Sequence, residues 1–239
     1  MIELMKLNPE VIDKTCPEAE VFESVLSLDK QNILELGCGD AFITRLLAMT
    51  GEGRTITAAE VDVIQHEKNL LIDDLSNVDF ILSGSEKIPS DDNSFDVVFM
   101  FKSFHHVPKN LMLQALHEVK RVLKPGGYVY ISEPIFSGEF NEILRLFHDE
   151  EEVRQAAFDT IKKVVDDKTF LLVDELFFNT PVVFDHFAHY AEKVIGATHS
   201  DHQLSDELYA RVKQKFEQAY AKNGGNFIIP VRVDLLQKN

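Results

Sequence analysis

The stretch NILELGCGDAF, residues 32–42, decides the fold. Residues 33–36 form a short apolar run typical of a buried strand, and Gly37, Cys38 and Gly39 follow it directly before a helix expected to open near Ala41. Backbone N–H groups and the positive end of the helix dipole converge at such a loop. The loop therefore suits a carboxylate, a phosphate or a nucleoside, although a plain strand-to-helix turn is the alternative, because a short glycine motif alone is weak evidence.

Two residues narrow the choice of ligand. Phe42 stands where a full G-x-G-x-x-G motif has its third glycine, which argues against a pyrophosphate cofactor such as NAD or FAD. Glu35 lies within the apolar run, and a buried carboxylate needs hydrogen bonds or a nearby cation. A cofactor without pyrophosphate, carrying a positive charge, is the better match.

A second acidic residue marks the end of the next apolar run, RTITAAE. Glu60 follows the glycine loop by about twenty residues, at the spacing where an acid can accept hydrogen bonds from ribose hydroxyls. Asp62 would point the same way, so the choice between the two stays open, and a solvated carboxylate is the alternative for either.

The rest of the chain alternates between strand-like and helix-like segments. The runs NILEL, RTITAAEV, VDFILS, FDVVFMF and YVYISEP are separated by helical stretches such as FITRLLAMT and NLMLQALHEVKRVL. This rhythm predicts an α/β fold with a parallel sheet and helices on both faces. We expect a single domain with its core sheet over about 30–137, helical covering segments over about 1–30, 138–168 and 182–224, and closing strands over about 169–178 and 226–236.

Charge and composition exclude several classes of partner. The net charge is −16, which disfavours binding to nucleic acid and to anionic membranes. The two cysteines, Cys16 and Cys38, form neither a disulfide framework nor a zinc motif. The first residues resemble no export signal, and no apolar run is long enough to span a membrane. We expect a cytoplasmic protein.

Four stretches together resemble the class I S-adenosylmethionine-dependent methyltransferases, in the subgroup of the ubiquinone and menaquinone biosynthesis enzymes. They are ILELGCGDAF, TAAEVD, GSEKIPSDDNSFDVVFMFKSFHHVP and LHEVKRVLKPGGYVYISEP. The resemblance implies a Rossmann-like, doubly wound sheet of seven strands, mostly parallel with an antiparallel last strand. It also implies S-adenosylmethionine as cofactor, S-adenosylhomocysteine as product and in-line methyl transfer to a small molecule.

The resemblance also assigns residues to the cofactor. Ala41 replaces the family's usual third glycine, and Gly84 replaces an aspartate that commonly contacts adenine, so Ser85, Glu86 or backbone groups must supply that bond. The expected cofactor-binding residues are Glu35, Gly37, Cys38 and Gly39 for the methionine part, Glu60 for the ribose, Val61, Gly84, Ser85 and Glu86 around the adenine, and Phe101.

Candidate catalytic residues follow the fourth strand-like run. His105 and His106 lie where open α/β sheets place their ligands, and either is suited to act as a base if the acceptor must lose a proton. Lys102 could hold an acidic group of the acceptor. The alternatives are that one histidine only packs and that the lysine only covers apolar surface. We expect no metal.

The covering segments leave one question open. Their apolar faces either complete the core or form a lid over the sheet edge that excludes water during transfer. Two other functions stay open as well: a catalytically silent S-adenosylmethionine-binding protein and, disfavoured by Phe42, a nicotinamide-dependent oxidoreductase. The acceptor and the oligomeric state are not determined by the sequence.

Overall fold

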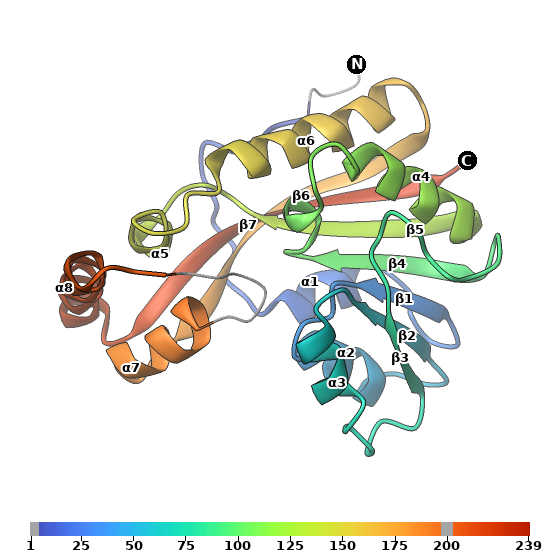
Figure 1. Ribbon diagram of the computed structural model, residues 1–239. Helices are drawn as coiled ribbons and strands as arrows, with labels where there is room; N and C mark the ends of the chain where they lie inside the picture. The colour runs from blue at the N-terminus through green and yellow to red at the C-terminus, as the bar shows by residue number, and fades with distance from the viewer. Residues whose placement is uncertain (1–4, 197–202) are drawn as a thin grey trace.

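The computed structural model describes residues 5–196 and 203–239, and its centre is one seven-stranded sheet (Figure 1). The strand order is β3-β2-β1-β4-β5-β7-β6. The strands are β1 (Asn32–Leu36), β2 (Thr55–Glu60), β3 (Val78–Leu82), β4 (Phe95–Phe101), β5 (Leu123–Pro134), β6 (Phe170–Val183) and β7 (Asn226–Lys238).

One strand runs against the others. β7 pairs antiparallel with both β5 and β6, whereas β1 to β5 pair in parallel. The expected mostly parallel sheet of seven strands with an antiparallel last strand is therefore confirmed. Strand order reverses direction between β1 and β4, and this switch point is where open α/β sheets bind their ligands.

Helices cover both faces of the sheet. α1 (Glu18–Val25) and α2 (Phe42–Met49) pack on one face through Phe22 and Leu47. On the other face, α4 (Met112–Val122) and α6 (Glu151–Asp166) bury a stripe that includes Leu116 and Ile161, because their apolar residues recur at helical spacing. α3 (Val63–Asn69) contacts β2 and β3, and a short 3-10 helix η1 (Phe104–His106) follows β4.

The long strands β6 and β7 extend beyond the rest of the sheet and carry a helical lobe (Figure 1). The lobe contains α5 (Glu139–Leu144), α7 (Phe187–Tyr190), the π-helix η2 (Ala191–Ile195) and α8 (Asp206–Asn223). Phe184, Tyr190, Phe216 and Phe227 form a separate apolar cluster there.

The boundaries of two elements differ from the sequence-based expectation. The helix expected over 138–168 is divided into α5 and α6. Between them the Asp149 carboxylate accepts the N–H of Glu151 at 3.1 Å, a local bond that competes with a continuous helix. β6 continues past residue 178 to Val183. Pro181 does not end the strand, because β6 lies at the edge of the sheet, where proline is tolerated.

Residues 1–4 and 197–202, which belong to the covering segments expected over 1–30 and 182–224, lie outside the described residues. In the part of the chain that is described, no helix combines the length and apolar character that a membrane crossing requires.

Candidate active site

The glycine loop, residues 37–41, is anchored to the end of β2. The N–H groups of Gly37 and Cys38 both donate to the carbonyl of Ala59, at 2.9 and 3.0 Å. Gly37 has φ +76°, and a Cβ there would lie 2.6 Å from the Cβ of Ser103, so both conformation and space require glycine. A Cβ on Gly39 would meet nothing within 4 Å, so the space above the loop is open.

Ala41 takes a conformation that favours glycine. It caps α2 with φ +62°, in the left-handed region, and its side chain is buried. An alanine there costs about 1 kcal/mol relative to its preferred conformations. Ala41 therefore adopts the backbone conformation that glycine would have in this loop, and the strain lowers the stability of the fold by about this amount.

Glu60 belongs to the loop, whereas Asp62 belongs to the next helix. One Glu60 carboxylate oxygen accepts the N–H of Gly39 at 2.8 Å, and the other accepts those of Val61 and Asp62 at 2.8 and 2.9 Å. The Asp62 carboxylate caps α3 by accepting the N–H of Ile64 at 2.9 Å. The geometry therefore separates Glu60, the acid favoured from the sequence, from Asp62, which the sequence did not exclude.

Glu35 is buried beneath the loop. Its carboxyl accepts the hydroxyl of Thr44 at 2.6 Å, but burial dominates and raises the pKa of Glu35 to about 8. Asn69, also buried, donates its amide to the carbonyl of Gly39 at 2.8 Å. Sequence reasoning missed Asn69, since an asparagine at the end of a helix carries no distinctive signal.

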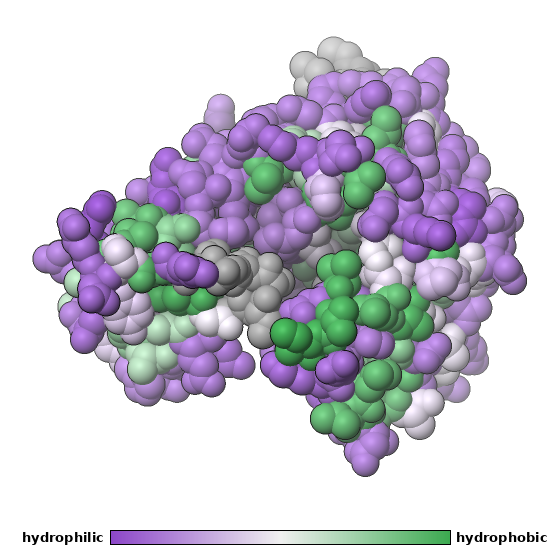
Figure 2. Space-filling view, viewed as in Figure 1, coloured by the Kyte–Doolittle hydropathy of each residue, from purple (hydrophilic) through white to green (hydrophobic). Residues whose placement is uncertain are grey.

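The remaining residues expected at the cofactor are divided between the loop and the core. Val61 is 67% exposed beside the loop. Figure 2 shows an apolar patch on the surface over α2 and α3, where Phe42, Met49 and Ile64 are exposed. The N–H of Ser83 donates to the carbonyl of Glu60 at 3.0 Å, which brings the turn holding Gly84, Ser85 and Glu86 alongside β2. Phe101 lies in the core instead, stacked on Phe99 with ring centroids 4.9 Å apart.

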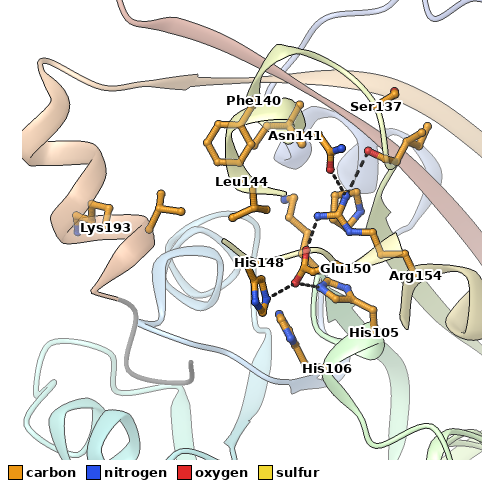
Figure 3. Close-up of a pocket in the computed structure, with 15 residues that line it drawn as sticks. His105, His106, Ser137, Phe140, Asn141, Leu144, His148, Glu150, Arg154 and Lys193 are labelled. Carbon is orange, nitrogen blue, oxygen red and sulfur yellow. Dashed lines mark hydrogen bonds and ion pairs between the residues drawn. The ribbon is translucent and has the colours of Figure 1, made fainter. Parts of the chain in front are cut away.

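A pocket of about 380 Å³ lies at the carboxyl ends of β4 and β5 (Figure 3). We call it the histidine pocket. It is lined by Lys102, His105, His106, Pro134, Ile135, Ser137, Phe140, Asn141, Leu144, His148, Glu150, Arg154, Lys193, Val194 and Ile229.

His105 is held between two carboxylates at the polar end of this pocket. Its Nδ1 lies 2.5 Å from Glu133 Oε2, and its Nε2 lies 3.4 Å from Glu150 Oε1. Burial opposes the charged imidazole, but the two glutamates outweigh it and raise the pKa of His105 to about 9. His106 is exposed, and its ring centroid lies 4.1 Å from that of His105.

The pKa values of Glu133 and Glu150 are shifted in the opposite direction. Burial acts to raise the pKa of Glu133 and of Glu150, but His105 outweighs it, and the pKa of each carboxyl is lowered. Arg154 adds to this effect at Glu150, with Nη2 2.5 Å from Oε2. Sequence reasoning missed Glu150 and Arg154, since neither lies in a recognisable motif.

Lys102 is oriented by its surroundings. It has φ +52°, and its Nζ forms an ion pair with the buried carboxylate of Glu18 in α1. The side chain still contributes to the wall of the histidine pocket.

Residues 102–106 connect the glycine loop to the histidine pocket. The hydroxyl of Ser103 donates to the carbonyl of Leu36 at 2.7 Å, immediately before Gly37. Lys102, His105 and His106, on either side of Ser103, line the pocket. The loop and the pocket therefore adjoin each other across the switch point of the sheet.

Comparison with known proteins agrees with this architecture. Residues 34–131 match the family model described as a methyltransferase domain. The chain is 31% identical over 122 residues to phthiotriol/phenolphthiotriol dimycocerosates methyltransferase 1 of Mycobacterium ulcerans, across 49% of this chain and 42% of that protein. It is 25% identical over 130 residues to ubiquinone biosynthesis O-methyltransferase of Hydrogenovibrio crunogenus, across 54% of this chain and 50% of that protein.

These matches span half, or somewhat less, of the curated relatives' length. The crystal structure of YcgJ protein from Bacillus subtilis superposes with a TM-score of 0.63 over 93% of this chain and 97% of that chain. Its sequence identity is 14%, so this likeness shows the fold alone. Residues 34–131 are thus similar to a methyltransferase domain, and the chain as a whole shares the fold of the YcgJ protein.

Proposed function

We propose that this protein transfers the methyl group of S-adenosylmethionine to a small-molecule acceptor held in the histidine pocket. The observation that carries the proposal is the segment 102–106, which contacts the glycine loop through Ser103 and lines the pocket with Lys102 and both histidines. A cofactor on the loop and an acceptor in the pocket would meet at this segment.

The loop fits the cofactor. Open space lies above Gly39, and the Glu60 carboxylate beside it is fixed by three backbone N–H groups. We assign Glu60 to the ribose hydroxyls, and Glu35 with residues 37–39 to the methionine part. Val61, Gly84, Ser85 and Glu86 are placed around the adenine. Phe101 supports the loop from the core rather than by direct contact.

The pocket supports an acceptor that is mostly apolar with one polar group. Ile135, Phe140, Leu144, Val194 and Ile229 form its apolar wall. The histidines, Glu150 and Arg154 gather at its other end, as Figure 3 shows. A polar acceptor atom at that end would be oriented while the apolar part excludes water.

Methyl transfer from a sulfonium mainly requires that the protein align the acceptor atom with the methyl group. The sulfonium of S-adenosylmethionine supplies an activated methyl group, and its positive charge disappears during transfer. The chain must hold the acceptor atom in line and exclude water. Both ring nitrogens of His105 face carboxylates, so His105 fixes the polar end of the pocket and does not itself take up a proton from the acceptor. His106 is then the better base, and Lys102 helps to place the acceptor.

We also propose that α5 and the segment 191–196 form a lid. Phe140 and Leu144 from α5 and Lys193 and Val194 from η2 close one side of the pocket. Phe184, Phe187 and Tyr190 pack into the lobe cluster instead, so they support the lid from behind. Hydrogen exchange should show protection across 138–150 and 187–196 when cofactor binds. Protection confined to the glycine loop and Glu60 would reduce both segments to scaffold.

The net charge and the free cysteines bear on the cellular compartment and on the class of substrate. Both cysteines are free and buried, and the net charge is −16. We place the enzyme in the cytoplasm, as one domain acting on small molecules rather than on nucleic acid or membranes.

The test has two stages. Calorimetry should show that S-adenosylmethionine and S-adenosylhomocysteine bind and that NADH does not. Extracts of small metabolites incubated with methyl-labelled S-adenosylmethionine should then yield a labelled small product. Cofactor binding without any labelled product would favour the silent binding protein, and NADH binding alone would favour the oxidoreductase.

A further inference from the structure

Two histidines lie against one oxygen of Glu150 in the histidine pocket, and a third histidine, His106, lies nearby. Ligand atoms of His105, His106 and Glu150 all lie within 4.8 Å of one another. Glu150 Oε1 lies 2.9 Å from His148 Nε2 and 3.4 Å from His105 Nε2. Figure 3 shows the three imidazole rings gathered around this carboxylate.

One of these spacings has the value found in the ligand shell of a small divalent ion, and the others need only small side-chain shifts to reach it. Zinc binds histidine nitrogen and carboxylate oxygen at about 2.0–2.2 Å, so neighbouring ligands of a tetrahedral site lie roughly 3.3–3.5 Å apart. The distance from His105 Nε2 to Glu150 Oε1 already has this value, and that from His148 is somewhat shorter. Imidazole-rich sites suit zinc and its neighbours rather than magnesium or calcium.

The groups behind these ligands also have the arrangement of a metal site. Glu133 binds Nδ1 of His105 and thereby directs Nε2 toward Glu150. Arg154 binds Oε2 of Glu150 and leaves Oε1 for the histidines. A carboxylate behind a ligating histidine, and a hydrogen bond on a ligating carboxylate, are the usual outer contacts of metal ligands.

We infer that His105, His106 and Glu150, with His148 as a further ligand, bind a divalent transition-metal ion of the zinc type. Within residues 5–196 and 203–239, this is the one group of three or more His, Cys, Asp or Glu side chains close enough to hold an ion. The ion would lie at the polar end of the pocket, beside residues 102–106.

The role of the ion rests on the proposed function. A metal-bound hydroxyl or phenol loses its proton at lower pH, because the ion stabilises the oxyanion. The acceptor oxygen would join the four protein ligands as a fifth ligand, an expansion that zinc sites allow. His106 is then a ligand, and the ion rather than a free imidazole favours the deprotonated acceptor.

Metal binding can be measured without cofactor or acceptor. We expect the chelator-treated full chain to bind about one Zn²⁺ in equilibrium dialysis and not to bind Mg²⁺. Co²⁺ in the same site should give the intense visible absorption of a four-coordinate ion, and Zn²⁺ should abolish it.

Variants separate this site from adventitious binding. His106→Gln and His148→Gln should each weaken Zn²⁺ binding by about 100-fold or more, since loss of even an outer contact costs roughly 10- to 100-fold. His117→Gln, at an exposed position on α4, is the matched control and should bind like the wild type. Thermal unfolding of each variant checks its fold.

Zn²⁺ binding that is unchanged in both pocket variants, or absent from the wild type, would overturn the metal site. If a variant fails to fold, the Co²⁺ spectrum of the wild-type chain decides instead, because a six-coordinate spectrum contradicts the inferred site. A chain that methylates without binding Zn²⁺ refutes the metal alone. A chain that binds Zn²⁺ but not S-adenosylmethionine refutes the proposed function alone.

Discussion

The pKa values of buried carboxyl groups are shifted in opposite directions at the glycine loop and in the histidine pocket. Beneath the loop, Glu35 has only the hydroxyl of Thr44 to offset burial among the described residues that bond to it, and its pKa rises to about 8. In the pocket, His105 lowers the pKa of Glu133 and Glu150. The loop thus keeps its acid neutral below about pH 8, whereas the pocket keeps its acids charged through cationic partners.

This difference shows in which part of the site the buried charges already have partners within the protein. The charges of the pocket are compensated by residues of the chain itself, so its polar end is preorganised. The loop holds an acid whose charged form lacks a cation, and a cofactor with an ammonium and a sulfonium group would supply one.

The largest expected effect is the pH dependence that Glu35 imposes on stability. Its pKa rises from 4.5 to about 8 on folding, so the folded chain binds a proton that the unfolded chain releases between these values. The free energy of unfolding therefore falls as pH rises through this window, by up to about 1.4 kcal/mol per pH unit. Glu35→Gln should remove the part of the fall that Glu35 causes, as measured by urea unfolding at pH 5, 6.5 and 8, and leave the separate fall above about pH 6.5 that the raised pKa of His105 imposes.

The matched control for this experiment is Glu67→Gln, at an exposed position on α3. It should keep the wild-type pH profile. If Glu35→Gln also keeps that profile, the loop acid is charged in the folded protein and the contrast with the pocket disappears.

The second effect concerns catalysis by the pocket. Once an acceptor is identified, His105→Ala and His106→Ala should each lower kcat by about 100-fold, because both remove groups at the reacting end of the acceptor. The affinity for S-adenosylhomocysteine should change little, since the loop is untouched.

His117→Ala serves as the control for the two pocket histidines. Rates within about twofold of the wild type for both pocket variants would show that these histidines only pack. A loss of cofactor affinity equal to the loss of kcat would show that the loop and the pocket act as one unit.

The third effect concerns cofactor affinity. Glu60→Ala removes charge-assisted hydrogen bonds to the ribose and should weaken S-adenosylmethionine binding roughly 10- to 100-fold in calorimetry. Asp62→Ala should leave affinity nearly unchanged, because its carboxylate caps α3. The reverse pattern would mean that Asp62 is the ribose acid, and unchanged affinity in both variants would remove the assignment altogether.

The smallest effect comes from the loop backbone. Ala41→Gly should raise the free energy of unfolding by about 0.5–1 kcal/mol, because glycine adopts φ +62° without the strain that alanine carries. Gly126, which also has positive φ, provides the inverse control, since Gly126→Ala should destabilise. A destabilised Ala41→Gly variant would show that packing of the buried methyl group outweighs the strain.

Much of the fold could be predicted from the sequence because its signals are local. The apolar runs NILEL and FDVVFMF correspond to β1 and β4 residue for residue. The loop glycines and the spacing to Glu60 are likewise contiguous features, and the backbone conformation they require depends on neighbouring residues. The mostly parallel sheet of seven strands with an antiparallel last strand followed from the resemblance that these motifs carry, whereas the order of the strands came from the structure.

The histidine pair could be placed at the sheet edge, but its chemistry could not. Whether His105 acts as a base depends on Glu133 and Glu150, which lie 28 and 45 residues away in the chain. Lys102 was expected to face an acceptor, yet it pairs with Glu18, 84 residues earlier. Such pairs join residues far apart in the chain and belong to no periodic pattern or motif, so they cannot be predicted from the local sequence.

The sequence by itself determined the class of fold, the glycine loop and the acid at the end of β2, because short apolar periods and glycine conformations act within a few residues. Tertiary structure alone decided that Asp62 caps α3 instead of facing the loop, that Asn69 holds Gly39, and that Glu150 and Arg154 complete the pocket. Those choices depend on burial and on charges that meet only after the sheet and its covering helices have assembled.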